Sequence, residues 1–126
     1  MLLLAIALAG GAGAVARYGV ATLAMRAAPT FPYATLAVNV LGSFLLGLLM
    51  RVGMDATHGF GATSTVRLAL TIGFCGGFTT FSTFSAETVL LLESGSYGRA
   101  ATYVVASVGL SLVALALGFA LARMVR

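Results

Sequence analysis

The sequence predicts an all-α integral membrane protein with four transmembrane helices, the third of which is broken near its middle. Three observations support this prediction. Hydrophobic residues make up 60% of the 126-residue chain and charged residues only 8%, against roughly 25% charged residues in soluble domains. Four apolar stretches are long enough to cross or nearly cross a bilayer. The third stretch contains glycines and hydroxyl residues where a simple anchor has leucine and valine.

The first two spans are separated by a short loop that contains proline. The first span covers about 2–23, and because its start lacks the basic segment of a cleavable signal, we interpret it as a membrane helix. Pro29 and Pro32 end the helical pattern. The second span covers about 33–50 and contains no charged residue.

Two further spans complete one membrane domain, 1–126. The stretch 51–67, which includes His58, is predicted to be an exposed connection, and no role is assigned to it. The third span covers about 68–92 and is followed by a short turn. The fourth span covers about 100–122 and is free of charge.

The third span is predicted to break near Gly76 to Thr79. Three glycines cluster just before five hydroxyl residues, and both glycine and β-branched threonine weaken a helix. Irregular backbone persists in hydrocarbon only where protein buries it or a water-filled cavity lines it, so we expect the break inside an assembly. Carbonyls freed at the break suit a cation such as Na⁺, and the N–H groups of the following half-helix favour an anion nearby.

Polar residues recur at four-residue steps in the second and fourth spans, which places each set on one helix face. Each stripe alone is typical of interhelical hydrogen bonding or close helix packing. Together with a broken helix, the two stripes outline a polar track. The residues concerned are Thr35, Asn39 and Ser43, and Tyr103, Ser107 and Ser111.

Phenylalanines recur every three residues in the third span, at Phe78, Phe81 and Phe84. They are expected along one side of the helix that follows the break, beside hydroxyl residues in the same two turns. Core packing is the ordinary explanation of such a triplet. A phenyl ring also has a positive edge, and ring edges beside hydroxyl donors can stabilise a small anion without a full charge that would trap it.

The charged residues leave several alternatives open. Arg17 either snorkels to the interface or lines an anion-attracting vestibule, and Glu87 caps a helix, pairs with an arginine or carries a proton. Four spans place both termini on one side with four arginines, against two or three on the other. This bias is weak, so the chain inserts either with its termini in the cytoplasm or in both orientations. The scattered arginines do not suggest nucleic-acid binding, and Cys75, the only cysteine, excludes an intrachain disulfide.

Three motifs make the chain resemble the Fluc fluoride channels, the CrcB family of fluoride exporters. The glycine-rich first motif covers 10–18 and ends in Arg-Tyr. The second motif is Asn-Val-Leu-Gly-Ser-Phe at 39–44, followed by Gly47. The third motif, Gly-Phe-Cys-Gly-Gly-Phe-Thr-Thr-Phe-Ser-Thr-Phe-Ser at 73–85, resembles the family signature nearly in full. The similarity extends over the whole chain.

The resemblance implies an antiparallel, dual-topology homodimer in the cytoplasmic (inner) membrane, with fluoride pores along its interface, and not an enzyme. It implies a central structural Na⁺ held by the backbone carbonyls of Gly76 and Thr79 from both subunits. The residues that match the fluoride pore are Asn39, Phe81, Phe84, Ser82, Thr83, Tyr103, Ser107 and Ser111. The residues that match the vestibule or its polar support are Arg17, Thr35, Ser43, Thr80 and Glu87.

Two other functions compete with a fluoride channel. A small proton-coupled multidrug transporter has a similar size, but such a mechanism usually needs a glutamate in the first helix, and the only membrane glutamate here is Glu87 in the third span. A purely structural membrane protein is the third alternative, and the polar stripes with Asn39 and Ser107 argue against it. The identity of the ion rests on the motif match alone.

Overall fold

The computed structural model describes residues 1–27, 30–53 and 64–124. It contains four long apolar segments. All four are long and apolar enough to cross a membrane, and no strand occurs in the described residues. This result confirms the prediction of an all-α protein with four such helices. The elements in order are α1 (Leu2–Ala27), α2 (Tyr33–Gly53), α3 (Thr65–Leu68), η1 (Ala69–Cys75), α4 (Gly76–Phe78), α5 (Phe81–Glu93) and α6 (Tyr97–Met124).

Most helices extend a few residues beyond the spans that hydropathy predicts. α1 continues to Ala27 and α6 begins at Tyr97, because a helix continues into the polar interface after its apolar stretch ends. Part of the connection predicted at 51–67 lies outside the described residues, and His58 is in that part.

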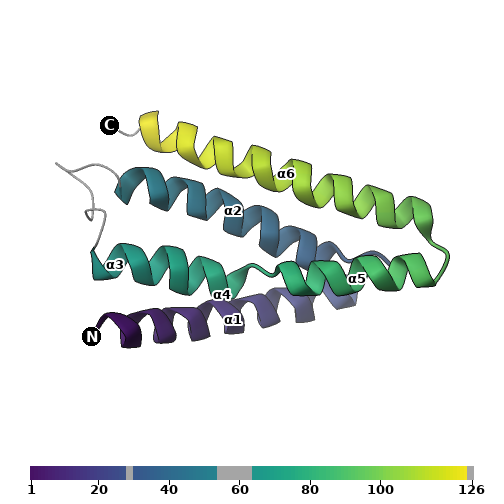
Figure 1. Ribbon diagram of the computed structural model, residues 1–126, viewed down its shortest axis with the longest axis horizontal. Helices are drawn as coiled ribbons and strands as arrows, with labels where there is room; N and C mark the ends of the chain where they lie inside the picture. The colour runs from purple at the N-terminus through teal and green to yellow at the C-terminus, as the bar shows by residue number, and fades with distance from the viewer. Residues whose placement is uncertain (28–29, 54–63, 125–126) are drawn as a thin grey trace.

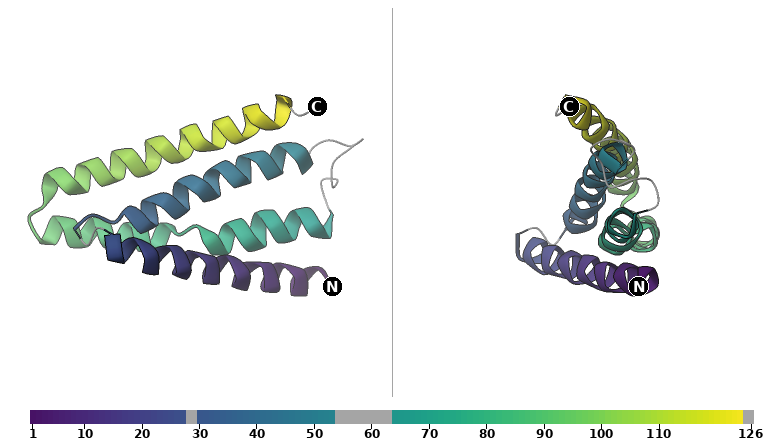
Figure 2. Two further views of the ribbon diagram at one scale, coloured as in Figure 1. Left: turned by 180° about the vertical axis from the view of Figure 1, so that it is seen from behind. Right: turned by 90° about the vertical axis from the view of Figure 1, so that its left-hand side faces the viewer.

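The helices lie side by side in the order α6, α2, the third span and α1 (Figure 1). Seen end-on, they form an open, curved arrangement with α1 and α6 at opposite edges (Figure 2). α2 and α6 run in the same direction, and both chain ends lie at the same end of the molecule (Figure 1). The arrangement therefore leaves one side of several helices uncovered.

Small residues allow the two closest helix pairs to form. α1 packs on η1 and α4, and a Cβ at Gly13 would overlap the backbone carbonyl of Phe74. α2 packs along α6, and a Cβ at Gly47 would overlap the carbonyl of Leu115. Small residues at such contacts let helix backbones approach closely within a membrane.

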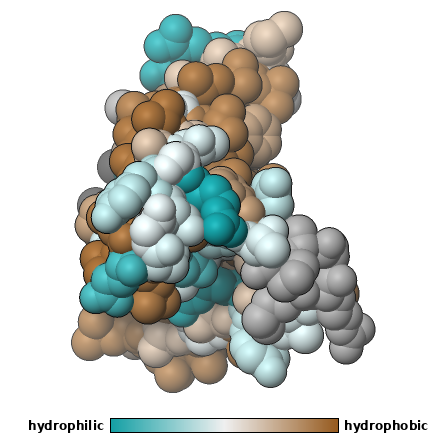
Figure 3. All heavy atoms as spheres, turned by 90° about the vertical axis from the view of Figure 1, so that its right-hand side faces the viewer, coloured by the Kyte–Doolittle hydropathy of each residue, from teal (hydrophilic) through white to brown (hydrophobic). Residues whose placement is uncertain are grey.

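Much of the apolar surface is not covered by the chain itself. Between 6% and 22% of the residues in each span's most apolar window are buried. Viewed from the end where α5 meets α6, polar residues gather around the turn while apolar residues cover the body behind it (Figure 3). A polar end and an apolar body suit a chain that crosses a bilayer.

The break in the third span lies at Thr79 and Thr80, at the C-terminal end of the range that the sequence predicts. Both residues have extended backbone angles, whereas Gly76 is helical. The prediction is confirmed for Thr79 and wrong for Gly76, which stays helical while the neighbouring Gly73 and Gly77 pack against the backbone of α1. The prediction for Phe78 was also wrong, since this residue is buried in α4 before the break and not on the helix after it.

Candidate functional site

One side chain of α2 hydrogen-bonds the non-helical backbone at the break in the third span. The Asn39 amide accepts a hydrogen bond from the N–H of Thr80 at 2.8 Å and donates to the carbonyl of Thr80 at 3.1 Å. The Thr80 hydroxyl caps α5 by accepting from the N–H of Thr83 at 3.1 Å. The N–H and carbonyl of Thr80 and the N–H of Thr83 thus have partners within the chain, as a low-dielectric surrounding requires.

The carbonyl of Gly76 is released by the same arrangement. In a continuous helix it would accept from the N–H four residues on, but that N–H, on Thr80, donates to Asn39. The carbonyl of Thr79 accepts from Arg17 Nη1 at 3.3 Å and keeps a second lone pair. These two oxygens fit the sequence-based prediction of a cation held by carbonyls. Among the described residues, no three His, Cys, Asp or Glu side chains group to hold a metal ion.

A pocket of about 320 Å³ opens beside the break. It brings together residues from both polar stripes, the break and the phenylalanine pair. Its lining includes Asn39, Ser43, Gly76, Thr79, Thr80, Phe81, Phe84, Ser107 and Ser111. The Ser107 side chain is 4% exposed, and its Oγ has no hydrogen-bond partner in the described part of the chain. A buried hydroxyl without a partner is costly, so this pocket has an unused donor at its wall.

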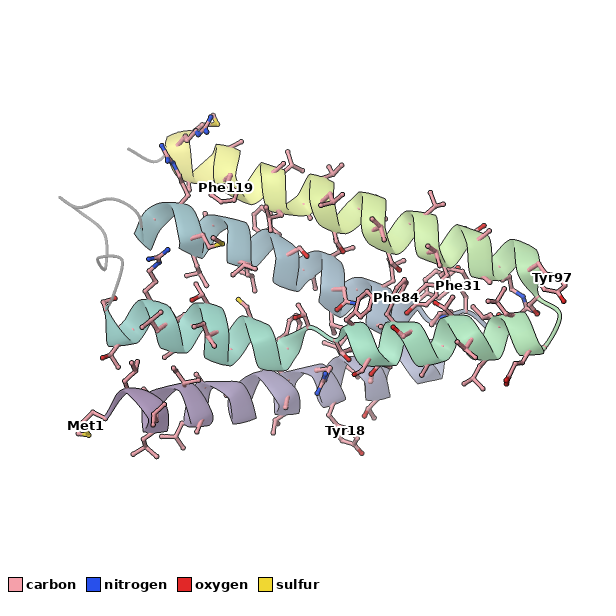
Figure 4. The ribbon with its side chains drawn as sticks, in the orientation of Figure 1. Met1, Tyr18, Phe31, Phe84, Tyr97 and Phe119 are labelled. Atoms are coloured by element: carbon pink, nitrogen blue, oxygen red, sulfur yellow. The ribbon has the colours of Figure 1, made fainter. Side chains whose placement is uncertain are left out.

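The two phenylalanines of the pocket have different surroundings. The rings of Phe81 and Phe84 lie 5.4 Å apart between centroids and are tilted by 44°. Phe84, which Figure 4 labels, is buried, and its ring lies 5.2 Å from the ring of Tyr103. Phe81 is 77% exposed, so its ring is free to contact a further molecule at the mouth of the pocket.

A second group of polar residues lies on the other side of the break. Glu87 accepts hydrogen bonds from the hydroxyl of Thr35 at 2.9 Å and from that of Tyr103 at 2.6 Å. Tyr103 is fully buried. A carboxylate with two hydroxyl donors is fixed in position, and such charge-assisted bonds are short and strong.

This second group borders a pocket of about 380 Å³ between α1, α2 and α5. Arg17, Thr35, Thr83 and Glu87 line it, and Thr80 lines both pockets. The polar stripe of α2 is therefore divided, with Thr35 at one pocket and Asn39 and Ser43 at the other.

Two residues of the predicted set lie outside both linings. Tyr103 is buried behind Phe84 and reaches Glu87 rather than either pocket. Ser82 is exposed, and its hydroxyl lies 3.2 Å from that of Thr80. Thr71 and Cys75 also line the pocket beside the break, although they belong to no site that the sequence predicts. Their four-residue spacing to Thr79 places all three on one face and was the available signal.

Comparisons with known proteins agree on one family. The family model described as "CrcB-like protein, Camphor Resistance (CrcB)" matches residues 4–119. A protein of Geobacter sulfurreducens named fluoride-specific ion channel FluC is 52% identical over 125 residues, which cover 96% of each chain. Proteins with the same name from Phenylobacterium zucineum and Agrobacterium fabrum are 47% and 46% identical. They cover 98% of this chain and 96% and 98% of their own.

Proposed function

The chain belongs to the CrcB family, and on this premise we propose that it is a fluoride-specific ion channel through which cytoplasmic fluoride leaves the cell passively. It is a multi-pass membrane protein and not an enzyme. The observation that carries the site assignment is the pocket beside the break, which gathers Asn39, Phe81 and Ser107 from three helices.

The pocket offers hydrogen-bond donors that can replace the water molecules that a small anion gives up on entry. The Asn39 amide nitrogen has two hydrogens, of which one donates to Thr80, so the second is available to an anion. The Ser107 hydroxyl is buried without a partner among the described residues. The positive edges of Phe81 and Phe84 add weak attraction. These groups favour entry of an anion, and because none carries a full charge they also permit its exit.

The second group of polar residues supports the pore from behind. Glu87 and Tyr103 are joined by a 2.6 Å hydrogen bond, and the Tyr103 ring packs on Phe84. Glu87 is thereby linked through one ring to the wall of the pocket. We assign a supporting role to Thr35, Glu87 and Arg17, as for the vestibule positions that the sequence predicts.

The pocket needs a cover, and a second copy in antiparallel orientation provides it. Phe81 is 77% exposed and Gly76 is exposed at the mouth of the pocket, where polar groups and irregular backbone would otherwise meet lipid. The weak arginine bias between the two ends favours insertion in both orientations. The two-fold axis of such an antiparallel pair lies in the membrane plane. We place the pair in the cytoplasmic (inner) membrane.

A structural Na⁺ completes this proposal at the centre of the dimer. The carbonyls of Gly76 and Thr79 would hold it, and it would supply positive charge where the two breaks meet. The release of the Gly76 carbonyl by the Asn39 contact supports this assignment. Arg17 already donates to the Thr79 carbonyl, so the ion would share that oxygen with a guanidinium group.

Ion efflux from liposomes tests the function. Vesicles that contain the purified protein are expected to release fluoride and to retain chloride, each followed with a selective electrode, while vesicles without protein retain both. Equal release of the two ions, or release of neither, would exclude a fluoride-specific channel.

The two competing functions gain no support from the comparisons. The relatives reported above are named channels, and no feature of the described residues favours a proton-coupled transporter over them. A purely structural role leaves the unpartnered Ser107 hydroxyl and the open pocket without explanation.

A further inference from the structure

One arginine joins two turns at the same end of the molecule. Arg99, in the first turn of α6, donates from Nη1 to the carbonyl of Thr30 at 3.1 Å and from Nη2 to the hydroxyl of Ser96 at 2.9 Å. Thr30 precedes α2, and Ser96 lies in the turn between α5 and α6. Because a guanidinium group is planar and rigid, these two bonds fix the chain at Thr30 against the start of α6.

Phe31, the residue that follows Thr30, lies against the buried ring of Tyr103. The two ring centroids are 5.6 Å apart and the ring planes cross at 83°, which is the edge-to-face arrangement that aromatic pairs prefer. The carbonyl of Phe31 also accepts a hydrogen bond from the N–H of Tyr33 at 2.8 Å. Phe31 is half-buried, whereas Tyr103 has no exposed surface. Phe31 therefore forms part of the cover over Tyr103.

The contacts of Tyr103 continue inward to the pocket beside the break. Its hydroxyl donates to Glu87 at 2.6 Å, and its ring lies 5.2 Å from that of Phe84. Phe84 lines the pocket and contacts Phe81 at its mouth. The Tyr103 ring is thus held by its hydroxyl, by Phe84 on one side and by Phe31 on another. A change at Phe31 can reach the pocket through this single ring.

We propose that Phe31 is a positioning residue of the fluoride path and that Arg99 holds it in place. This inference rests on the function proposed above. Interior side chains are closely packed, so Phe31 keeps the Tyr103 ring from shifting, and Tyr103 in turn keeps Phe84 at the wall of the pocket. Phe31 and Arg99 line neither of the two pockets. They act on the path through Tyr103, from the end of the molecule where α5 meets α6.

Fluoride efflux from liposomes tests the role of Phe31 when the initial rate is expressed per folded protein, well below the unfolding temperature. Phe31→Leu keeps an apolar side chain and removes the ring pair, which is expected to lower the rate about two- to ten-fold. Phe31→Tyr keeps the ring, and because the position is half-buried the added hydroxyl can reach water, so the rate is expected to stay normal. Phe119→Leu is the matched control, since Phe119 is a half-buried residue of α6 outside both pockets.

A double-mutant cycle tests whether Arg99 acts through Phe31. Arg99→Gln is expected to lower the rate in the wild-type background and to cause no further loss in Phe31→Leu, because both changes release the same ring. A charge that only attracts anions to the surface would lower the rate in both backgrounds, and screening by salt would remove this effect. Arg123→Gln removes the same charge from the other end of α6 and is expected to leave the rate unchanged.

Three outcomes would overturn the proposal. If the wild type releases fluoride and Phe31→Leu releases it equally fast, Phe31 does not position the path, although the proposed function stands. Independent effects of Arg99→Gln and Phe31→Leu would separate Arg99 from Phe31. Absence of fluoride release by the wild type would remove the proposed function and this inference with it. If Phe31→Leu does not fold, Arg99→Gln decides the question, because Arg99 is exposed and its replacement leaves no cavity; an unchanged rate would then contradict the proposal.

Discussion

The side chain of Asn39 pairs with Thr80 as a neighbouring strand would, accepting from its N–H at 2.8 Å and donating to its carbonyl at 3.1 Å. An amide is the side chain that offers both a donor and an acceptor in this geometry. Asn39 is thus a structural partner of the break and, in our proposal, a donor to the permeating ion.

Asn39→Asp is expected to reduce fluoride flux at least about 10-fold, since a charge-assisted bond is worth roughly 1.5 kcal/mol or more. The carboxylate cannot donate to the Thr80 carbonyl and places a negative charge in an anion path. Flux is measured by fluoride efflux from liposomes. The control is Leu46→Met, a near-isosteric change in the same pocket, which is expected to conduct normally. Normal conduction by Asn39→Asp would contradict the pore assignment.

Phe81→Ile separates conduction from folding. Because Phe81 is 77% exposed, its replacement is expected to lower fluoride flux while the thermal unfolding midpoint of the chain in detergent changes little. Phe84 is buried against Tyr103, so Phe84→Ile is expected to lower both quantities. Unimpaired flux in Phe81→Ile would remove the exposed ring from the pore.

The hydrogen bond between Tyr103 and Glu87 is expected to stabilise the fold. Tyr103→Phe removes a donor to the carboxylate at a cost of about 1.5–3 kcal/mol and should lower the unfolding midpoint. Tyr18→Phe is the matched control, because Tyr18 is 72% exposed and points away from the molecule (Figure 4). In a double-mutant cycle, Tyr103→Phe and Glu87→Gln are expected to be non-additive. Additive effects would show that the two side chains do not act together.

The sequence predicted the helices and most of the pocket, because apolar length and four-residue spacing are local properties. The four-residue steps predicted a polar track of two stripes, and the structure brings Asn39, Ser43, Ser107 and Ser111 of these stripes to one pocket, although the family resemblance matched Ser43 to the vestibule. The sequence could not separate Thr35 from them, since the division depends on where the chain breaks. The break was predicted from Gly76 to Thr79, which is correct at Thr79 and too early at Gly76. Glycine is a weak helix former in isolation, but here Gly73 and Gly77 pack against the backbone of α1. The hydrogen-bond partners of the freed backbone groups depend on tertiary contacts, and the spacing of residues along the chain does not predict them.

The contact between α1 and the first half of the third span depends on the absence of a side chain at Gly13. A Cβ there would overlap the carbonyl of Phe74 and approach the N–H of Phe78, whereas a Cβ at Gly11 meets nothing within 4 Å. Gly13→Ala must therefore push α1 away from η1 and α4, and such overpacking costs about 1–3 kcal/mol. Since α1 carries Arg17, which bonds the Thr79 carbonyl, we expect the variant to lose thermal stability and fluoride flux together. Gly11→Ala, two residues away on the same helix, should change neither. Equal behaviour of the two alanine variants in melting and efflux measurements would contradict the packing described for α1, and with it the position of Arg17 beside the break.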